Sequence, residues 1–384
     1  MNSLNDSVFK KIIIAAIALL SVLLSFIYFY RVTDNYYLAD IAPHVEGAKM
    51  VFKSFTIYSI TPNRTIVVSY PIFHICTKVV SYLVGGDFTL SASLVLSFFS
   101  ILTWFVIIFI IRDIYRQSLL DSCSIIEYCS IGLIFMTALP LTGKLYLPQG
   151  SPTVWHNPTY ITMKPFALLT FYYIYKVICK GLFNKKNIVL LTILSFVSCL
   201  AKPSSSIVIV PAVFMYAAID AFEHRRVDIK KILTICGIFA PTIGLLAIQF
   251  LQTFGESSGT GIRFGTFLEL NIVDSIIATL AVIIFPLIYS ISVKFKYTNK
   301  AMMKLAICCF IVGWMQYYFL YEIEYAHGNY AWGYFIGIFV LYFATYVDFG
   351  CKVKKSIVIL VYIVQSGIGL YYLYELLTLH SYLI

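Results

Sequence analysis

The chain contains 384 residues, of which 60% are hydrophobic and only 12% are charged, and it carries a net charge of +10. Repeated apolar runs of about 18 to 22 residues, the length that crosses a bilayer core, exclude a soluble globular protein and indicate a polytopic membrane protein. The loops between these runs account for the positive charge, so we do not expect a nucleic acid partner.

The first apolar run follows Lys10 and Lys11 and ends in aromatic residues near Tyr30. It lacks the small-residue cleavage site of a signal peptide, so we expect it to remain in the protein as the first membrane span. The full chain predicts about eleven crossing helices. In chain order they lie near residues 11–30, 93–111, 125–142, 161–178, 187–203, 206–222, 232–250, 272–291, 301–319, 331–347 and 357–375.

The predicted fold is therefore an all-α polytopic membrane protein, with a single transmembrane domain over residues 1–384 and no separate soluble domain. Most of the 28 lysines and arginines fall in alternate loops if the N-terminus is cytoplasmic. Because short cytoplasmic loops are enriched in Lys and Arg, this pattern predicts a cytoplasmic N-terminus and an extracytoplasmic C-terminus. We expect an integral protein of a bacterial inner membrane, surrounded by the lipid bilayer.

A further apolar stretch at residues 67–84 is open to two interpretations. His74 and Lys78 interrupt it, Tyr70 and Pro71 lie near its start, and counting it as a crossing would invert every later loop. We expect a juxtamembrane or re-entrant helix at the outer surface. The alternative is an ordinary twelfth span in which Lys78 snorkels to the interface.

The unusual polar residues of the chain gather in four loops on the predicted outer side. These loops are residues 31–92, 143–164, 251–271 and 321–332. The inner loops are short, basic and otherwise featureless. Since ionisable groups in an apolar membrane protein mark functional sites, we expect any chemistry to be extracytoplasmic.

The first outer loop carries an acidic motif in which Asp40, His44 and Glu46 lie close together. Apolar residues recur at helical spacing between residues 41 and 58, which predicts an amphipathic helix lying on the membrane. Asp40 would begin this helix and share a face with His44. Asp40 is then either a general base for an acceptor hydroxyl or only a helix N-cap. Asp34, nearer the first span, is a competing base or a solvated interface residue.

Three short motifs lie beside predicted membrane boundaries: Ala39-Asp40-Ile-Ala-Pro-His44, Ser69-Tyr70-Pro71-Ile-Phe-His74 and Ala201-Lys202-Pro203-Ser204. They resemble the early acidic motif, the Tyr-Pro element and a Lys-Pro element of the GT-C superfamily of polytopic membrane glycosyltransferases. Such enzymes use polyprenyl-phosphate-linked sugars at the outer face and have about 11 to 13 spans, with juxtamembrane helices in the first outer loop. The chain lacks the Trp-Trp-Asp sequence of oligosaccharyltransferases and the paired Asp-Glu of protein O-mannosyltransferases, so the resemblance indicates the superfamily and no subfamily.

The resemblance implies an inverting transfer of a sugar from a polyprenyl-phosphate donor to a hydroxyl of a glycan or glycolipid acceptor. Asp40, with His44 beside it, would be the general base. Cations and N–H donors would stabilise the departing phosphate, and the candidates are Lys202, Arg263, Lys164 and His156. Polar and aromatic groups would hold the sugar and the acceptor, and the candidates are Glu46, Tyr70, His74, Glu322, Glu324, His327, Asn329 and Trp332.

Two of these assignments have plain structural alternatives. Lys202, in a tight outer turn, is either an anion ligand or a lysine that snorkels to the surface. Trp332 and its neighbouring tyrosines are equally typical of an interfacial aromatic belt, although a belt does not account for Glu322, Glu324 and His327 beside them.

We expect no cofactor and find no metal-ligand signature, although the resemblance allows a divalent cation. The chain has no GxGxxG or Gly-Lys-Ser/Thr phosphate loop, which argues against an enzyme that uses a nucleotide sugar or ATP. The nine cysteines show no disulfide framework.

Two other classes of protein fit the same span pattern. An O-antigen or polysaccharide polymerase or ligase also acts on lipid-linked glycans outside, but would have a larger late outer loop richer in arginine. A flippase or transporter of lipid-linked glycans would place polar residues near the bilayer midplane and often show internal repeats, and the sequence shows no convincing repeat. The glycosyltransferase is therefore the leading hypothesis.

Overall fold

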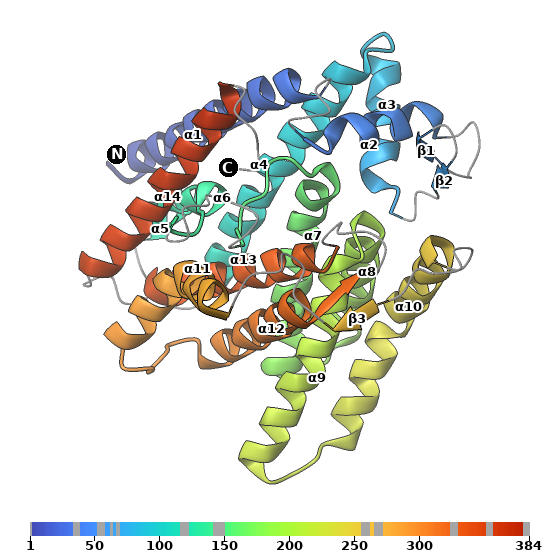
Figure 1. Cartoon of the computed structure of the whole chain (residues 1–384). Coiled ribbons are helices and arrows are strands. Elements are labelled where there is room, and N and C mark those ends of the chain that lie inside the picture. The colour runs from blue at the N-terminus through green and yellow to red at the C-terminus, as the bar shows by residue number, and fades with distance from the viewer. Residues whose placement is uncertain are drawn as a thin grey trace.

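The computed structural model describes residues 2–33, 39–51, 58–61, 64–66, 70–115, 123–140, 150–254, 262–264, 272–322, 329–350 and 356–378. Within these ranges most elements are helices (Figure 1). Eight of the described helices are long and apolar enough to cross a membrane, which is the architecture of an integral, polytopic membrane protein. They are α1 (Asn2–Val32), α4 (Phe88–Tyr115), α9 (Ser204–His224), α10 (Ile229–Phe254), α11 (Ile272–Ser292), α12 (Lys300–Phe319), α13 (Asn329–Gly350) and α14 (Ser356–Leu377).

Two further predicted spans are present as somewhat shorter helices. α7 (Pro158–Ile174) runs directly into a π-helical turn at Tyr175–Cys179, and α8 (Lys185–Ala201) follows it. Asn157 caps the start of α7 by accepting a backbone N–H, and Pro158 occupies the first turn, where its missing N–H costs nothing. Each of the two α-helices has 17 residues, close to the shortest length that crosses a bilayer core.

The prediction of a continuous helical span at residues 125–142 is wrong. The chain there forms two short helices, α5 (Cys123–Cys129) and α6 (Gly132–Phe135), followed by backbone without regular secondary structure over residues 136–140. Hydropathy alone gives the same signal for a continuous and an interrupted apolar segment. Irregular backbone inside an apolar bundle requires hydrogen-bond partners from neighbouring helices, and the sequence pattern does not reveal them.

α14 supplies these partners to the interrupted segment. The Tyr362 hydroxyl donates to the carbonyl of Cys129 (2.5 Å), and Gln365 Nε2 donates to the carbonyl of Thr137 (3.1 Å). The backbone of Thr137 donates in return to the carbonyl of Gln365 (3.4 Å). Residues 133–138 are buried in protein, and α14 satisfies backbone groups of the interrupted segment there.

α14 approaches the interrupted segment so closely that position 369 requires glycine. A β-carbon on Gly369 would lie 1.4 Å from the carbonyl oxygen of Phe135, whereas nothing lies within 4 Å of a β-carbon on Gly367. We expect Gly369→Ala to lower the free energy of unfolding by about 1–3 kcal/mol or more, because α14 must move away. Gly367→Ala, the matched control, should be neutral or stabilising, because alanine favours helix. Thermal unfolding in detergent measures both variants, and equal melting temperatures would contradict this packing.

α13 lies inside the bundle, and 94% of its apolar stretch is buried. Glycines allow its close approach to α12: a β-carbon on Gly313 would lie 2.9 Å from Cα of Tyr334, and one on Gly337 would lie 2.8 Å from the carbonyl oxygen of Cys309. Small residues at a helix interface permit such backbone contact between helices in a membrane. This contact fixes the position of α13 and therefore of Trp332 in its first turn.

The segment between α1 and α4, which the sequence predicts to be the first outer loop, contains two short helices. They are α2 (Ile41–Met50) and α3 (Ile72–Leu83). α3 has 12 residues, too few to cross a bilayer core, which agrees with the juxtamembrane interpretation of residues 67–84. α2 ends at Met50, earlier than the helix expected over residues 41–58, so that prediction was too long.

Two short antiparallel sheets lie in the loops of this otherwise helical fold. β1 (Tyr58–Thr61) pairs with β2 (Arg64–Ile66), and β3 (Ile262–Phe264) pairs with β4 (Leu320–Glu322). In the second sheet Arg263 lies opposite Tyr321. This pairing joins the glycine-rich loop before α11 to the loop before α13, so two loops far apart in sequence lie side by side.

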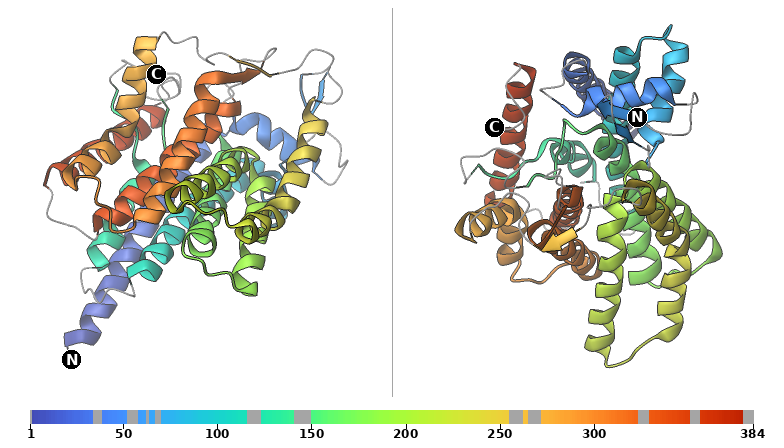
Figure 2. Two further views of the ribbon diagram at one scale, coloured as in Figure 1. Left: turned by 90° about the horizontal axis from the view of Figure 1, so that it is seen from below. Right: turned by 45° about the vertical axis from the view of Figure 1, so that its right-hand side comes forward.

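α9 runs from one end of the helix bundle to the other. The turn between α8 and α9 contains Lys202 and Pro203 and lies at one end, near α2 and α3. The turn between α9 and α10 lies at the other end, about 30 Å away along the 21 residues of α9. Figure 2 shows α9 and α10 as an antiparallel pair that extends beyond the other helices at this second end.

Candidate functional site

Asp40 lies between α1 and α2 with its carboxylate partly open to solvent, since 40% of the side chain is exposed. It occupies the N-cap position of α2, but its side chain makes no capping hydrogen bond, so the interpretation as a cap alone is wrong. Instead, Asn157 Nδ2 donates to Asp40 Oδ2 (3.0 Å), and the Asp40 amide donates to the carbonyl of His156 (3.0 Å). The segment before α7 therefore fixes this carboxylate through both backbone and side chain.

Asn157 connects Asp40 to Lys202. Its amide nitrogen donates to Asp40, while its side-chain oxygen accepts a hydrogen bond from Lys202 Nζ (3.4 Å). Thr159 Oγ1 accepts a shorter hydrogen bond from the same Nζ (2.9 Å) and itself donates to the Asn157 oxygen (2.9 Å). The first turn of α7 thus holds a carboxylate on one side and an amine on the other.

Lys202 is buried rather than extended to the surface, with only 4% of the residue exposed, so the snorkelling interpretation is wrong. Its Nζ lies 5.3 Å from the ring centre of Tyr70 and 5.0 Å from that of Trp332, distances typical of cation–π contacts. Burial lowers the pKa of Lys202 to about 7, and the nearby charge of Asp40 opposes this shift. An anion that entered this site would favour the charged form of the amine.

Three histidines surround these groups, and burial keeps each of them neutral near neutral pH. Burial lowers the pKa of His156 to about 4, with Asp40 opposing the shift and Lys202 adding to it. Burial also lowers the pKa of His74 to about 4, against a backbone hydrogen bond that raises it. The pKa of His44 is held well below its usual value by burial first, then by His74 and Lys202. His156 can therefore donate an N–H to a phosphate but brings no charge to it.

Many of the predicted site residues form one continuous chain of contacts, which we call the Asp40–Lys202 cluster. His156 Nε2 lies 3.7 Å from Asp40 Oδ2, and the His156 ring lies 5.4 Å from that of Trp332. The rings of Tyr70 and His44 lie 6.4 Å apart. His44 Nδ1 and His74 Nε2 are 3.0 Å apart, so one of these rings donates to the other. The members of the cluster are Asp40, His44, Tyr70, His74, His156, Asn157, Thr159, Lys202 and Trp332.

Glu46 lies away from the cluster. Its side chain is 54% exposed and accepts a hydrogen bond from Lys49 Nζ (2.6 Å) on the outer face of α2. An exposed pair of this kind, three residues apart on a helix, contributes little stability and leaves no carboxylate directed at a substrate. The structure therefore does not bring Glu46 to the acceptor position that the sequence predicted.

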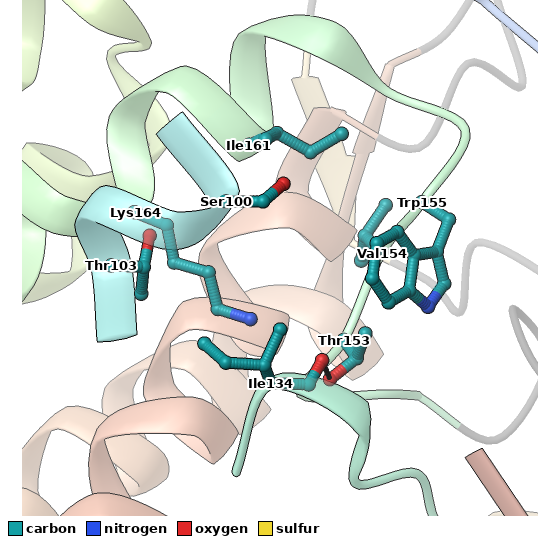
Figure 3. A pocket seen from close by; sticks show the side chains of 8 residues that line it. All are labelled: Ser100, Thr103, Ile134, Thr153, Val154, Trp155, Ile161 and Lys164. Carbon is teal, nitrogen blue, oxygen red and sulfur yellow. Dashed lines mark hydrogen bonds between the residues drawn. The ribbon is translucent and has the colours of Figure 1, made fainter. Parts of the chain in front are cut away.

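Lys164 also lies apart from the cluster, in the second turn of α7. Its Nζ lies 4.0 Å from the ring centre of Phe339. The ring centre of Tyr160 lies 5.9 Å from Lys164 Nζ and 6.1 Å from the ring centre of Trp332, so Tyr160 lies between Lys164 and Trp332. Among the described residues it makes no contact with Asp40 or Lys202. It instead lines a small separate pocket, shown in Figure 3.

The remaining predicted residues lie wholly or partly outside the described residues. Arg263 and Glu322 are in the paired strands β3 and β4, and Asn329 begins α13, but the positions of their side chains are not described. Glu324 and His327, together with Asp34, fall outside the described ranges. The backbone pairing nevertheless connects the loop of Arg263 to the loop of Glu322, two loops that the sequence analysis treated separately.

Asn157 and Thr159 are the members of the cluster that the sequence analysis did not assign to a role. A local signal for Asn157 was present, because Asn followed by Pro158 at the start of an apolar run is typical of a helix N-cap. The side-chain oxygen of a capping Asn accepts a hydrogen bond from a backbone N–H of the helix, which leaves its amide N–H groups able to donate to another acceptor. The sequence gives no indication that this acceptor is Asp40, which is more than a hundred residues away.

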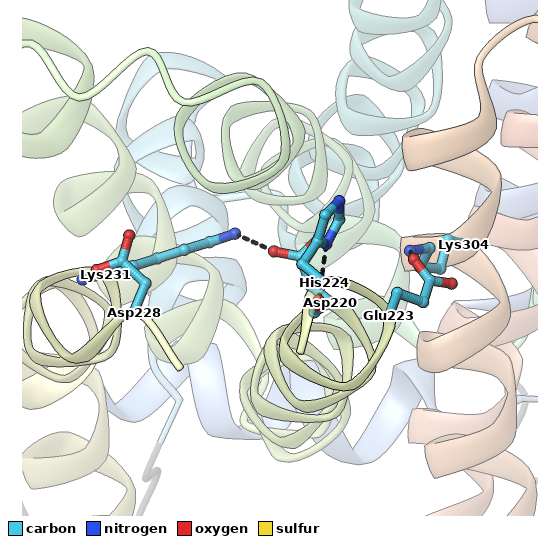
Figure 4. A network of polar contacts seen from close by, with 6 residues as sticks. All are labelled: Asp220, Glu223, His224, Asp228, Lys231 and Lys304. Atoms are coloured by element: carbon cyan, nitrogen blue, oxygen red, sulfur yellow. Dashed lines mark hydrogen bonds and ion pairs between the residues drawn. The ribbon is translucent and has the colours of Figure 1, made fainter. Parts of the chain in front are cut away.

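The opposite end of the bundle carries a second polar network (Figure 4). Among the described residues, one group of carboxylates and imidazoles is close enough to share a metal ion: Asp220, Glu223 and His224 at the end of α9. Lys231 Nζ lies 2.8 Å from Asp220, and Lys304 forms an ion pair with Glu223. Lysines already balance both carboxylates, so this network joins α9 to α10 and α12 and is not an open cation site.

Comparisons with known proteins give no relative from which a function can be transferred. No model of a known protein family matches the chain, and no curated protein matches it significantly. The geometry of the Asp40–Lys202 cluster is therefore the basis for proposing a function.

Proposed function

We propose that the chain is a membrane glycosyltransferase resembling the GT-C superfamily, which moves a sugar from a polyprenyl-phosphate donor to a hydroxyl of a glycan or glycolipid acceptor. The observation that carries this proposal is the Asp40–Lys202 cluster, in which a solvent-open carboxylate and a buried lysine both bind Asn157. A base accessible to an acceptor and a cation able to receive a phosphate are the two groups that such a transfer requires.

In the proposed reaction Asp40 accepts the proton of the acceptor hydroxyl while that oxygen attacks the anomeric carbon of the sugar. The bond between the anomeric carbon and the phosphate oxygen breaks, and polyprenyl phosphate leaves with the bonding electrons. Attack opposite the leaving group inverts the anomeric configuration. Asn157 binds Oδ2 of Asp40, while Oδ1 has no hydrogen-bond partner among the described residues, so Oδ1 is the oxygen available to the acceptor.

Lys202 is suited to stabilise the departing phosphate. Because burial disfavours its charge in the unliganded protein, an arriving phosphate anion would restore the ammonium form in a site from which water is largely excluded. The neutral His156 would add an N–H donor nearby. The faces of Tyr70 and Trp332, which flank the ammonium, provide aromatic surfaces for the sugar or the first isoprene units.

We further propose eleven crossings, with the cluster on the extracytoplasmic side. The interrupted segment that contains α5 and α6 would make the third crossing, α7 and α8 the fourth and fifth, and the eight long helices the others. Two observations support this orientation. The cluster gathers the loops predicted to lie outside, and the basic residues Lys176, Lys231 and Lys304 form ion pairs at the other ends of their helices.

The transferase is tested by reconstituting the purified protein in liposomes with radiolabelled polyprenyl-phosphate hexoses and pentoses and a glycolipid extract of bacterial envelopes as acceptor. We expect one donor to lose its label to the acceptor fraction with release of polyprenyl phosphate. If no donor transferred its sugar and the protein instead moved intact donor across the bilayer, the proposed transferase activity would be contradicted and a flippase favoured.

The orientation is tested with single cysteines in a variant that lacks the native ones. A cysteine at the exposed position 46 should react with a membrane-impermeant maleimide in intact cells, whereas a cysteine at the exposed position 228 should react only after permeabilisation. The reverse pattern would contradict an extracytoplasmic cluster while leaving the chemistry of Asp40 and Lys202 untested by this measurement.

A further inference from the structure

Lys164 is a buried amine that has no polar partner within the part of the chain that the structure describes. Only 6% of the residue is exposed, and Nζ makes no hydrogen bond or ion pair with any residue that the structure describes. Its contacts are with the faces of Phe339 (4.0 Å) and Tyr160 (5.9 Å), which favour a cation through their ring quadrupoles. Aromatic faces alone do not satisfy the three N–H donors of an ammonium group.

The amine is directed into a small cavity that also contains hydroxyl groups (Figure 3). Thr103 and Thr153 donate their hydroxyl hydrogens to backbone carbonyls, at 2.8 and 3.0 Å, and the Ser100 hydroxyl has no hydrogen-bond partner among the described residues. The rest of the lining is apolar or aromatic, and none of the lining residues is acidic. The cavity therefore offers N–H and O–H donors and an amine that can carry one positive charge, with no acidic residue in the lining.

We propose that this cavity binds a single monovalent anion of halide size, held by the Lys164 ammonium and the Ser100 hydroxyl. The volume open to the centre of a water-sized particle is about 20 Å³. A site for one water needs roughly 10–15 Å³ on the same measure, so the volume of the cavity suits one small ion. A buried ammonium that has donors to spare and no carboxylate partner is best complemented by an anion.

This site is distinct from the proposed reaction centre and does not depend on it. The lining comes from α4, α6, the segment before α7, and α7 itself, so a bound anion would connect the interrupted segment to α4 and α7. It would act as a structural ion, and its binding should stabilise the folded protein in proportion to the logarithm of the anion concentration.

Thermal unfolding of the purified protein in nanodiscs tests the site, with sodium chloride or bromide compared with sodium gluconate at equal ionic strength. We expect the melting temperature of the parent protein to rise with halide concentration and not with gluconate. Lys164→Met removes the charge at similar volume and should abolish the halide response, and Ser100→Ala should weaken it. The exposed Lys49→Met is the matched control and should retain the full response. Equal melting temperatures in the two salts would overturn the proposal.

Anomalous scattering from bromide-soaked crystals of the parent protein provides a test that does not depend on a variant folding. A bromide peak in contact with Lys164 Nζ and Ser100 Oγ is expected. Density for a water molecule at this position without an anomalous signal would overturn the assignment of an anion and indicate a neutral amine.

Discussion

Replacing Asp40 with Asn should reduce sugar transfer by roughly 10²–10⁴-fold in kcat, the range expected when a general base is removed. Asn retains the volume of Asp and can still accept the hydrogen bond from Asn157, so the position of residue 40 should not change. It cannot take the acceptor proton, because its amide is not basic at neutral pH. Steady-state transfer with a saturating donor measures kcat.

A control of the same chemical change separates catalysis from a general effect of charge removal. Asp228 caps α10 at the opposite end of the bundle by accepting the Lys231 backbone N–H (2.9 Å). Asn caps a helix about as well as Asp, so Asp228→Asn should transfer sugar at the parental rate with an unchanged melting temperature. Near-parental transfer by Asp40→Asn would remove Asp40 as the base, even if the chain proves to be a glycosyltransferase.

Simple physical rules predict from the sequence that Asp40, His156, Lys202 and Trp332 lie at one end of the bundle. The alternation of apolar runs and the distribution of basic residues assign each loop to one side of the membrane. Loops on the same side of a compact bundle lie close together, so their residues have few possible neighbours. Eight of the eleven predicted spans are found as long apolar helices for the same reason. The roles of these residues are not fixed by such rules and remain proposals.

Other features depend on contacts between distant segments and could not be predicted in this way. The interrupted segment around Gly132 is as apolar as a regular span, and hydrogen bonds from distant residues such as Tyr362 and Gln365 satisfy groups of its irregular backbone. The pairing of β3 with β4 contributes so few residues that no strand periodicity is visible. Lys164 and Lys202 follow similar patterns, since each is followed by proline near the predicted outer end of a span. Only the structure separates them, because within the described ranges Lys202 has polar partners and Lys164 has none.

The affinity for a polyprenyl-phosphate donor should fall as the pH rises through the pKa of Lys202. Burial lowers this pKa to about 7 in the unliganded protein, so the amine is charged below that pH and neutral above it. A phosphodiester such as decaprenyl-phosphate glucose keeps a single negative charge from about pH 6 to about pH 9, so its own ionisation does not contribute. Since the anion binds the charged form, the apparent Kd should rise by up to about tenfold for each pH unit above 7.

Two substitutions assign this pH dependence to Lys202. Lys202→Arg keeps a positive charge over the whole range, so the Kd should become nearly independent of pH, although the different shape of the guanidinium group should weaken binding overall. Lys202→Met removes the charge and should bind the donor weakly at every pH, because the phosphate would then lie in a buried site without a cation. Isothermal titration in nanodiscs at about pH 6 and about pH 9 distinguishes the three proteins. If Lys202→Met retained the parental affinity and pH profile, the phosphate would have to bind elsewhere, and Arg263 in the paired loops would become the first residue to test.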